Sequence, residues 1–244
     1  MKTHSFLISA VSISFVSLVY IFFYFLKKSN FFLDLNNSKL LKETARIRLV
    51  LLHRLSGVFL FGLLPFFVIT IVFKSPIDKF GFLLQYRNES LPWIFGLGLI
   101  IVLINKFAAK SQKNLSVYPQ IRAKEWNFQL IVLSTLSWMA YLLAYEFMFR
   151  GFLLFSCIQN LSLVSAITIN VILYSLAHLP KSIGETIGAV PLGIIFCLLT
   201  FHFGTIWPAF WIHCFMALSN EWYSIKYHPE IKVKIFKHLL KISE

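Results

Sequence analysis

The sequence predicts an all-α, polytopic transmembrane helix bundle of about seven spans, within a range of six to eight. Hydrophobic residues make up 58% of the 244 residues and charged residues only 14%, whereas a soluble domain carries about 25% charged residues. The mean hydropathy is +0.74. The apolar residues also gather in runs of about 20, which is the length that a helix needs to cross a bilayer.

The first apolar run is Phe6–Leu26, which ends at Lys27 and Lys28. It is too long for a usual signal-peptide core and no A-x-A cleavage site follows, so we interpret it as a retained span. Six more runs give the remaining expected spans: Leu49–Phe73, Pro92–Ala109, Phe128–Phe155, Leu161–His178, Gly184–Phe201 and Thr205–Tyr223.

The net charge of +13 does not indicate nucleic-acid binding, because the Lys and Arg residues form short runs between apolar stretches. Their distribution instead predicts the orientation. The loop over residues 74–90 is expected outside, with Lys181 and the C-terminus in the cytoplasm. The compact chain is typical of a bacterial protein, so we expect it in a cytoplasmic (inner) membrane.

The chain divides into three parts by content. Residues 1–125 carry spans and charged loops, residues 126–223 hold most of the intramembrane ionisable groups, and residues 224–244 form a basic tail that is expected to lie on anionic lipid. Cys157, Cys197 and Cys214 form no CxxC pair and stand in apolar contexts, so neither a disulfide nor a zinc ribbon is expected.

Ionisable residues inside the membrane mark the candidate site, since a charge at the bilayer centre costs at least about 2.5 kcal/mol. The candidates are Glu146, Arg150, His178, Glu185, His213 and Glu221. Glu146 and Arg150 are four apart and share a helix face, which fits either a structural ion pair or a carboxylate oriented to activate water. Two histidines in addition fit general acid/base chemistry or a metal site.

These residues carry a family resemblance. The order Glu-x-x-x-Arg-Gly from Glu146, aromatic-x-x-x-His ending at His178, and a third motif at His213 resembles the CPBP family of intramembrane proteases. This CAAX protease and bacteriocin-processing (Abi) group includes the type II CAAX prenyl endopeptidases. The resemblance covers about residues 126–223, and the Gly204–Pro208 stretch resembles the family's lead-in to the third motif.

Three positions depart from the common family pattern. Tyr145 stands where the family commonly has the first Glu of Glu-Glu-x-x-x-Arg, which is its usual water activator. Tyr174 replaces a common Phe, and Ala217 stands where the third motif has Asn or Asp. A subgroup pattern with His-x-x-Lys-x-x-x-Glu and a late acidic residue matches Lys181, Glu185 and Glu221, so we interpret the chain as a subgroup variant.

The resemblance implies an intramembrane endopeptidase. Glu146 is expected to activate water, with Arg150 fixing its charge and with His178 and His213 donating to the oxyanion or the leaving amine. The substrate is expected to be a membrane-embedded or lipid-anchored peptide. The alternative functions are an inactive scaffold or immunity protein that keeps the fold and, less favoured, a small transporter that uses the polar cluster as a proton relay.

We expect the site to act without a metal or another cofactor. Zn²⁺ held by Glu146, His178 and His213 is the alternative, but it consumes the carboxylate and stands close to Arg150. Helix lengths pose a further question, because counted from the outer ends Glu146 and His213 lie roughly 12–14 Å deep and His178 roughly 24 Å. The segment from Arg150 to Asn160 is therefore expected to be re-entrant, or the fifth span to begin below the surface.

Overall fold

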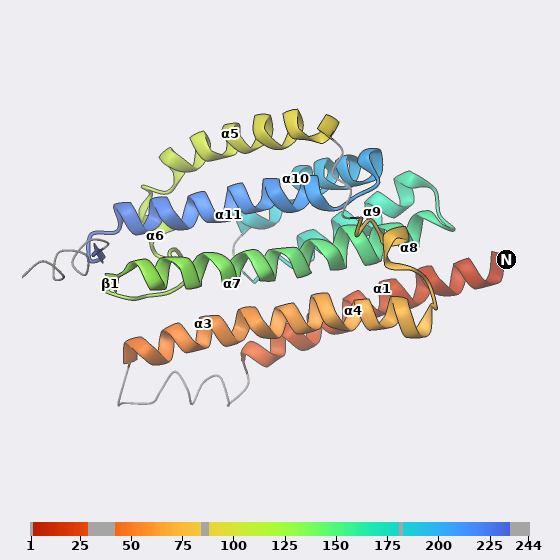
Figure 1. Cartoon of the computed structure of the whole chain (residues 1–244), viewed down its shortest axis with the longest axis horizontal. Coiled ribbons are helices and arrows are strands. Elements are labelled where there is room, and N and C mark those ends of the chain that lie inside the picture. The colour runs from red at the N-terminus through yellow and green to blue at the C-terminus, as the bar shows by residue number, and fades with distance from the viewer. Residues whose placement is uncertain (1, 29–41, 84–87, 181–182, 235–244) are drawn as a thin grey trace, which may run out of the picture.

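The computed structural model describes residues 2–28, 42–83, 88–180 and 183–234, and it confirms the all-α helix bundle (Figure 1). The helices are α1 (Lys2–Lys27), α3 (Lys42–Val58), α4 (Leu64–Phe67), α5 (Leu91–Ala108), α6 (Gln112–Leu115), α7 (Phe128–Glu146), α8 (Leu154–Ile158), α9 (Leu163–Leu176), α10 (Ile183–Phe203) and α11 (Trp207–Tyr227). Three π-helical segments continue these helices: η1 (Phe59–Leu63), η2 (Val68–Val72) and η5 (Phe147–Leu153). Two short 3₁₀ turns are η3 (Ile77–Phe80) and η4 (Asn88–Ser90).

Five stretches of the described chain are long and apolar enough to cross a membrane: Phe6–Leu26, Glu43–Val72, Asn88–Ala108, Phe128–Ile158 and Ile183–Phe203. They contain or largely overlap five of the seven expected spans. The expected span at Leu161–His178 contains the shorter apolar helix α9. The seventh, Thr205–Tyr223, overlaps most of α11, which has 21 residues but a more polar sequence and extends to Tyr227. The chain is thus an integral membrane protein with an all-helical core.

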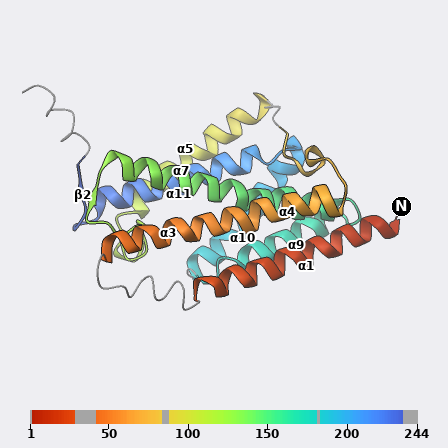
Figure 2. The same ribbon diagram turned by 60° about the horizontal axis from the view of Figure 1, so that its bottom comes forward.

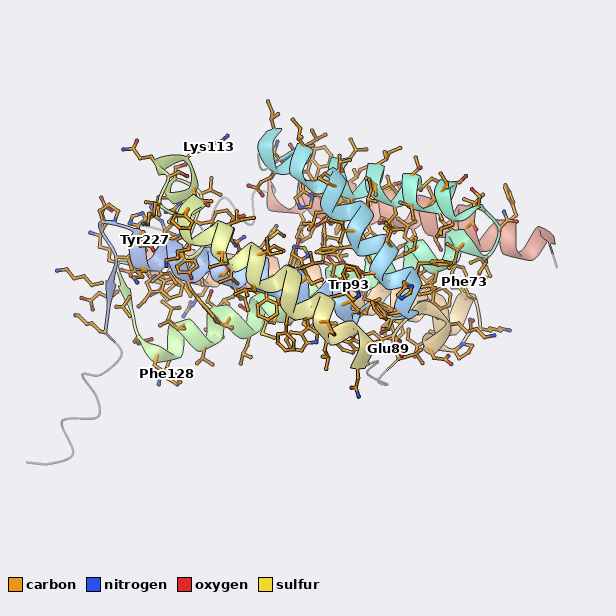
Figure 3. All side chains as sticks on the ribbon, turned by 90° about the horizontal axis from the view of Figure 1, so that it is seen from above. Phe73, Glu89, Trp93, Lys113, Phe128 and Tyr227 are labelled. Atoms are coloured by element: carbon orange, nitrogen blue, oxygen red, sulfur yellow. The ribbon has the colours of Figure 1, made fainter. Side chains whose placement is uncertain are left out.

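The long helices lie side by side in a layered bundle whose N-terminal helix runs along one edge (Figures 1 and 2). They alternate in direction along the chain. Seen from above, Lys113, Phe128 and Tyr227 lie at one end of the bundle, whereas Phe73 and Glu89 lie toward the other (Figure 3). The side of the membrane that each end faces stays a prediction, and Lys181 and residues 235–244 lie outside the described residues.

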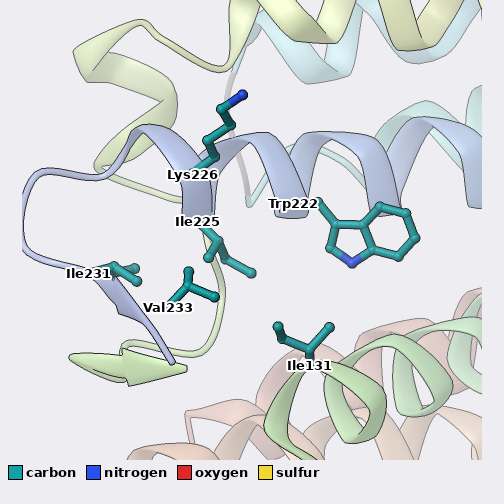
Figure 4. Close-up of a pocket in the computed structure, with 6 residues that line it drawn as sticks. All are labelled: Ile131, Trp222, Ile225, Lys226, Ile231 and Val233. Carbon is teal, nitrogen blue, oxygen red and sulfur yellow. The ribbon is translucent and has the colours of Figure 1, made fainter. Parts of the chain in front are cut away.

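At the end of the bundle that carries Tyr227, a two-residue parallel pair joins β1 (Glu125–Trp126) to β2 (Lys232–Val233). This pair brings the chain after α11 back to the start of α7. A surface cavity of about 430 Å³ lies between these elements (Figure 4). It is lined by Ile131, Trp222, Ile225, Lys226, Ile231 and Val233.

The outer surface of the bundle is apolar, as a bilayer requires. Large hydrophobic side chains on different helices are more than half exposed, among them Leu18 (66%), Ile71 (66%) and Phe107 (68%). A water-soluble monomer rarely exposes apolar patches of this extent. The polar and charged groups that are buried instead face the inside of the bundle, where the candidate site lies.

The expectation of a re-entrant segment between Arg150 and Asn160 is wrong. Residues 128–158 form one continuous helix in which η5 joins α7 to α8, and only a short turn separates it from α9 at Leu163. Counted from this turn, Glu146 lies roughly 18 Å along its helix and His178 roughly 22 Å along the next. The apparent difference in depth shrinks to a few ångströms because the fourth span is longer than its apolar run indicated.

Candidate functional site

Glu146 is the last α-helical residue of α7, and the π-helical turn η5 begins directly after it. Such π-helical turns are rare and occur frequently at functional sites. Arg150 lies on this turn, with its Nε 3.3 Å from Oε2 of Glu146. Both side chains are fully buried, so the pairing that the four-residue spacing predicted is present in the interior of the bundle.

His213 on α11 contacts the second oxygen of the Glu146 carboxylate. Its Nδ1 lies 2.6 Å from Oε1 of Glu146, a short charge-assisted hydrogen bond between groups 67 residues apart. Pro208 stands in the first turn of α11, where its missing N–H removes no helical hydrogen bond. The helix that follows presents the buried imidazole to α7, so Glu146 is held between one arginine and one histidine.

The guanidinium of Arg150 is surrounded mainly by aromatic rings. Its Cζ lies 4.1 Å from the ring centroid of Tyr174 and 5.3 Å from that of Phe196, within the range of cation–π attraction. None of its three side-chain nitrogens has a hydrogen-bond partner among the described residues, and neither does Oε2 of Glu146. The charge of Arg150 is therefore compensated by the ion pair and the rings. Its N–H groups donate no hydrogen bond to the described residues.

His178 stands just beyond α9, in a tight turn. Its backbone N–H donates to the carbonyl of Ser175 at 2.9 Å, and its Nδ1 lies 2.8 Å from the carbonyl of Tyr174. Its ring packs on the Tyr174 ring with a centroid distance of 4.7 Å. The turn and the ring contact thus fix the orientation of the imidazole.

Tyr145 lies at the centre of the candidate site. Its ring makes edge contacts with both imidazoles, with centroid distances of 6.3 Å to His178 and 6.0 Å to His213. It also contacts Phe149 and Tyr174, and it is 5% exposed. The four residues Glu146, Arg150, His178 and His213 thus gather around one phenol, which stands where the resemblance led us to expect a carboxylate.

The hydrogen bonds also fix the tautomers of the two histidines. A backbone carbonyl can only accept, so Nδ1 of His178 carries the proton that it shares with Tyr174. A carboxylate paired with an arginine is ionised and also only accepts, so Nδ1 of His213 donates to Glu146. In the neutral state both rings therefore keep a basic lone pair on Nε2.

Glu221 lies in a second buried cluster. It is eight residues beyond His213 on α11, roughly 12 Å along the axis. Its Oε1 lies 3.8 Å from Nη2 of Arg54, and its Oε2 accepts from the backbone N–H of Gln120 at 3.1 Å. The structure therefore places this predicted site residue with Arg54 of α3 rather than with Glu146.

Glu185 stands in the first turn of α10 and is partly exposed. It belongs to the same end of the bundle as Glu221. Burial, together with the negative charges of Glu185 and Glu221, raises the pKa of Tyr118 in the loop before β1. Lys181, its expected pairing partner, lies outside the described residues. Of the six predicted residues, the structure thus gathers four around Tyr145 and places two toward Tyr118.

The zinc alternative rests on Glu146, His178 and His213. Among the described residues, no three His, Cys, Asp or Glu side chains are grouped as a metal site. Glu146 and His213 lie together, but the Tyr145 ring packs against both His178 and His213. A catalytic zinc needs three ligands around one open position, so zinc stays the alternative to a metal-free site.

Residues 126–219 match the family model described as type II CAAX prenyl endopeptidase Rce1-like. This segment is therefore similar to the Rce1-like family. The match confirms the resemblance and includes all the predicted site residues except Glu221, although it covers less than half of the chain. The Rce1-like family is a protease family. No curated protein and no solved structure matches the chain.

Sequence reasoning did not identify two features of the site. It treated Tyr145 only as a missing carboxylate, although the aromatic residues Tyr141, Tyr145 and Phe149 recur every four positions and mark one helix face. It also drew no inference from Arg54, which lies in the expected span Leu49–Phe73. An arginine in an apolar run is itself a signal of a buried counter-charge, and Glu221 provides that charge.

Proposed function

We propose that the protein is an intramembrane endopeptidase in which the Glu146–His213 pair activates the attacking water. The observation that carries this proposal is the 2.6 Å contact between the two side chains, buried in the Rce1-like segment and flanked by Arg150. A carboxylate that fixes an imidazole by its Nδ1–H leaves Nε2 as the base, as in the acid–histidine part of a catalytic triad.

In the proposed reaction, water gives its proton to Nε2 of His213 as its oxygen attacks the scissile carbonyl. Glu146 stabilises the imidazolium that forms, and Arg150 keeps Glu146 ionised throughout. The imidazolium then returns the proton to the leaving amine, so that one water is added across the peptide bond. His178, in its cationic form, donates from Nε2 to the oxyanion.

The direct role for Glu146 that the resemblance implied is less favoured by this geometry. Oε1 is occupied by His213 and Oε2 faces Arg150, so both oxygens are already held by cationic or donor groups. Such a carboxylate is a weak base, because protonation must first disrupt its ion pair. We therefore assign proton abstraction to His213 and assign Glu146 the role of orienting and stabilising it.

The proposed substrate is a membrane-embedded or lipid-anchored peptide. The apolar outer surface and the buried position of the site favour a substrate that arrives within the bilayer. The family description adds prenylated CAAX peptides as one substrate class to test. For a bacterial chain, we place bacteriocin-like, pheromone-like and anchored regulatory peptides ahead of prenylated ones.

The test is cleavage of a panel of membrane-anchored peptides by the purified protein in lipid nanodiscs. We expect wild type to cleave at least one peptide class and His213→Gln and Glu146→Gln to lose roughly 10²–10⁴-fold in turnover. Glu230→Gln changes an exposed glutamate outside the bundle core and serves as the control. Cleavage that survives both site substitutions would contradict the proposal.

An inactive scaffold or immunity protein is the second candidate function. Tyr145 and Ala217 favour it, because they stand where the family resemblance places a carboxylate and an amide or acid. The same panel decides between the two functions. A wild-type protein that cleaves none of the peptides, while a known membrane protease cleaves them in the same nanodiscs, would favour the scaffold.

A further inference from the structure

The N-terminal helix α1 lies outside the Rce1-like segment but packs against it at two places. At the first, Ser9 donates to the backbone carbonyl of Ser156 at 2.8 Å, and the hydroxyls of Ser12 and Ser156 are 2.8 Å apart. These contacts are buried. Phe15 then meets Phe152 edge-on with a centroid distance of 5.3 Å. This part of α1 is thereby fixed against η5 and α8, the segment that carries Arg150.

At the second place, α1 reaches the turn of His178. The hydroxyl of Tyr20 donates to the backbone carbonyl of Ala177, the residue directly before His178. Ala177 is the C-cap of α9, and carbonyls at a helix C-terminus have no partner within the helix. Tyr20, from a distant part of the chain, therefore supplies the hydrogen-bond donor that the C-terminal end of α9 lacks.

The ring of Tyr20 is itself held in place. It stacks on Phe61 with a centroid distance of 6.3 Å and an interplanar angle of 15°. Phe61 is fully buried and meets the ring of Tyr145 edge-on at 5.9 Å. The chain of contacts from Tyr20 through Phe61 to Tyr145 leads to the phenol that packs against both histidines.

From this geometry we propose that Tyr20 is a positioning residue for His178. Its hydroxyl closes the end of α9 and fixes the backbone turn from which the imidazole projects. The turn holds His178 by two further bonds, from its N–H to Ser175 and from its Nδ1 to Tyr174. Loss of the Tyr20 donor frees the Ala177 carbonyl to turn toward another donor, which moves the adjacent imidazole. This inference rests on the proposed function for its kinetic consequence but not for its structural one.

The kinetic test uses the full chain in nanodiscs and the variant Tyr20→Phe, which removes one oxygen and keeps the ring. Small misplacements of a group that assists the reaction cost up to about 10²-fold in rate. We expect kcat to fall roughly tenfold with little change in KM. In a His178→Gln background, Tyr20→Phe should cause no further loss, because residues that act through one another are not additive. Additive losses in the double variant, or unchanged turnover in Tyr20→Phe, would overturn the proposal.

The matched control is Tyr24→Phe. Tyr24 lies one turn further along α1, and its ring contacts Phe25 and Lys28 rather than α9. We expect wild-type turnover from this variant. Equal losses in Tyr20→Phe and Tyr24→Phe would mean that α1 acts only by general packing, and would also overturn the proposal.

A measurement without activity separates this inference from the proposed function. With ¹⁵N-labelled histidine, the His178 ring signals, assigned by their loss in His178→Gln, report which nitrogen carries the proton. In the neutral form of the imidazole, reached by raising the pH, we expect the Nδ1–H tautomer in wild type and in Tyr24→Phe, and a mixture of tautomers in Tyr20→Phe. Identical His178 signals in wild type and Tyr20→Phe would overturn the positioning role whether or not the protein cleaves any peptide.

Discussion

Two buried clusters, each with one arginine and one glutamate, share the helices α7 and α11 but differ in how their polar atoms are satisfied. Arg54 donates to the carbonyl of Ser134 at 2.7 Å and to the hydroxyl of Ser137 at 2.9 Å. It also donates to the side-chain oxygen of Gln120 at 3.1 Å. The Arg54–Glu221 cluster thus ties α3, α7, α11 and the loop before β1 together by fixed hydrogen bonds.

The Glu146–Arg150–His213 cluster is built differently. Arg150 has no hydrogen-bond acceptor among the described residues for any of its three side-chain nitrogens, whereas Arg54 lacks one only for Nε. The Nε of Arg150 faces Oε2 of Glu146 at 3.3 Å as an ion pair, but without the geometry of a hydrogen bond. The Arg54–Glu221 pair, two helical turns along α11, shows that this bundle can hold a buried ion pair with more hydrogen bonds. The difference is what the proposed function leads us to expect, with the Arg54–Glu221 cluster supporting the fold and the Glu146 cluster carrying the chemistry.

The largest effect that tests this difference in role is expected when both charges of the Glu146 cluster are removed. The double variant Glu146→Gln, Arg150→Met should lose roughly 10²–10⁴-fold in turnover. Its free energy of unfolding should stay the same or rise by roughly 1–4 kcal/mol, since neutral replacement of a poorly bonded buried ion pair is often stabilising. Turnover and unfolding are measured in the same nanodiscs. A large loss of stability would mean that this cluster also supports the fold.

The next effect is expected in the Arg54–Glu221 cluster, on stability. Arg54→Met leaves the buried Glu221 carboxylate without its cation and should lower the free energy of unfolding by roughly 3–5 kcal/mol. Turnover per folded molecule should stay within about twofold of wild type. The added change Glu221→Gln removes the unpaired charge and should restore part of the stability. Lost turnover in a stably folded Arg54→Met protein would bring Glu221 back into the site.

Sequence patterns predicted the helices and the Glu146–Arg150 pair but not the contrast between the two clusters. Hydropathy located helices because each span must be apolar along its length, and the four-residue spacing paired Glu146 with Arg150. The π-helical turn after Glu146 and the contact of Tyr20 with Ala177 leave no such pattern. Glu221 was assigned to the site because it matched the late acidic residue of the subgroup pattern. The sequence does not show that its carboxylate pairs with Arg54 of α3 instead.

A smaller effect is expected from Gln120, which joins the loop before β1 to the Arg54–Glu221 cluster. Gln120→Leu removes the acceptor of Arg54 while the backbone N–H to Glu221 remains. Hydrogen bonds to charged groups contribute about 1.5–3 kcal/mol, and we expect a destabilisation near the lower end because Glu221 still compensates Arg54. Gln112→Leu, at an exposed position of α6, is the control. Equal stability of the two variants would show that the loop is not held by this bond.

The smallest effect should come from Glu185, which tests whether the site extends to the start of α10. Its partly exposed carboxylate stands in the first turn of the helix, where a negative charge stabilises by roughly 0.3–1 kcal/mol. Glu185→Gln should therefore cost less than about 1 kcal/mol of stability, and turnover should change by less than about twofold, because Glu185 lies toward Tyr118 rather than among the groups around Tyr145. Turnover is compared at equal protein levels with that of Glu230→Gln. A loss of tenfold or more would assign Glu185 to the catalytic machinery and extend the site from the Tyr145 cluster toward Tyr118.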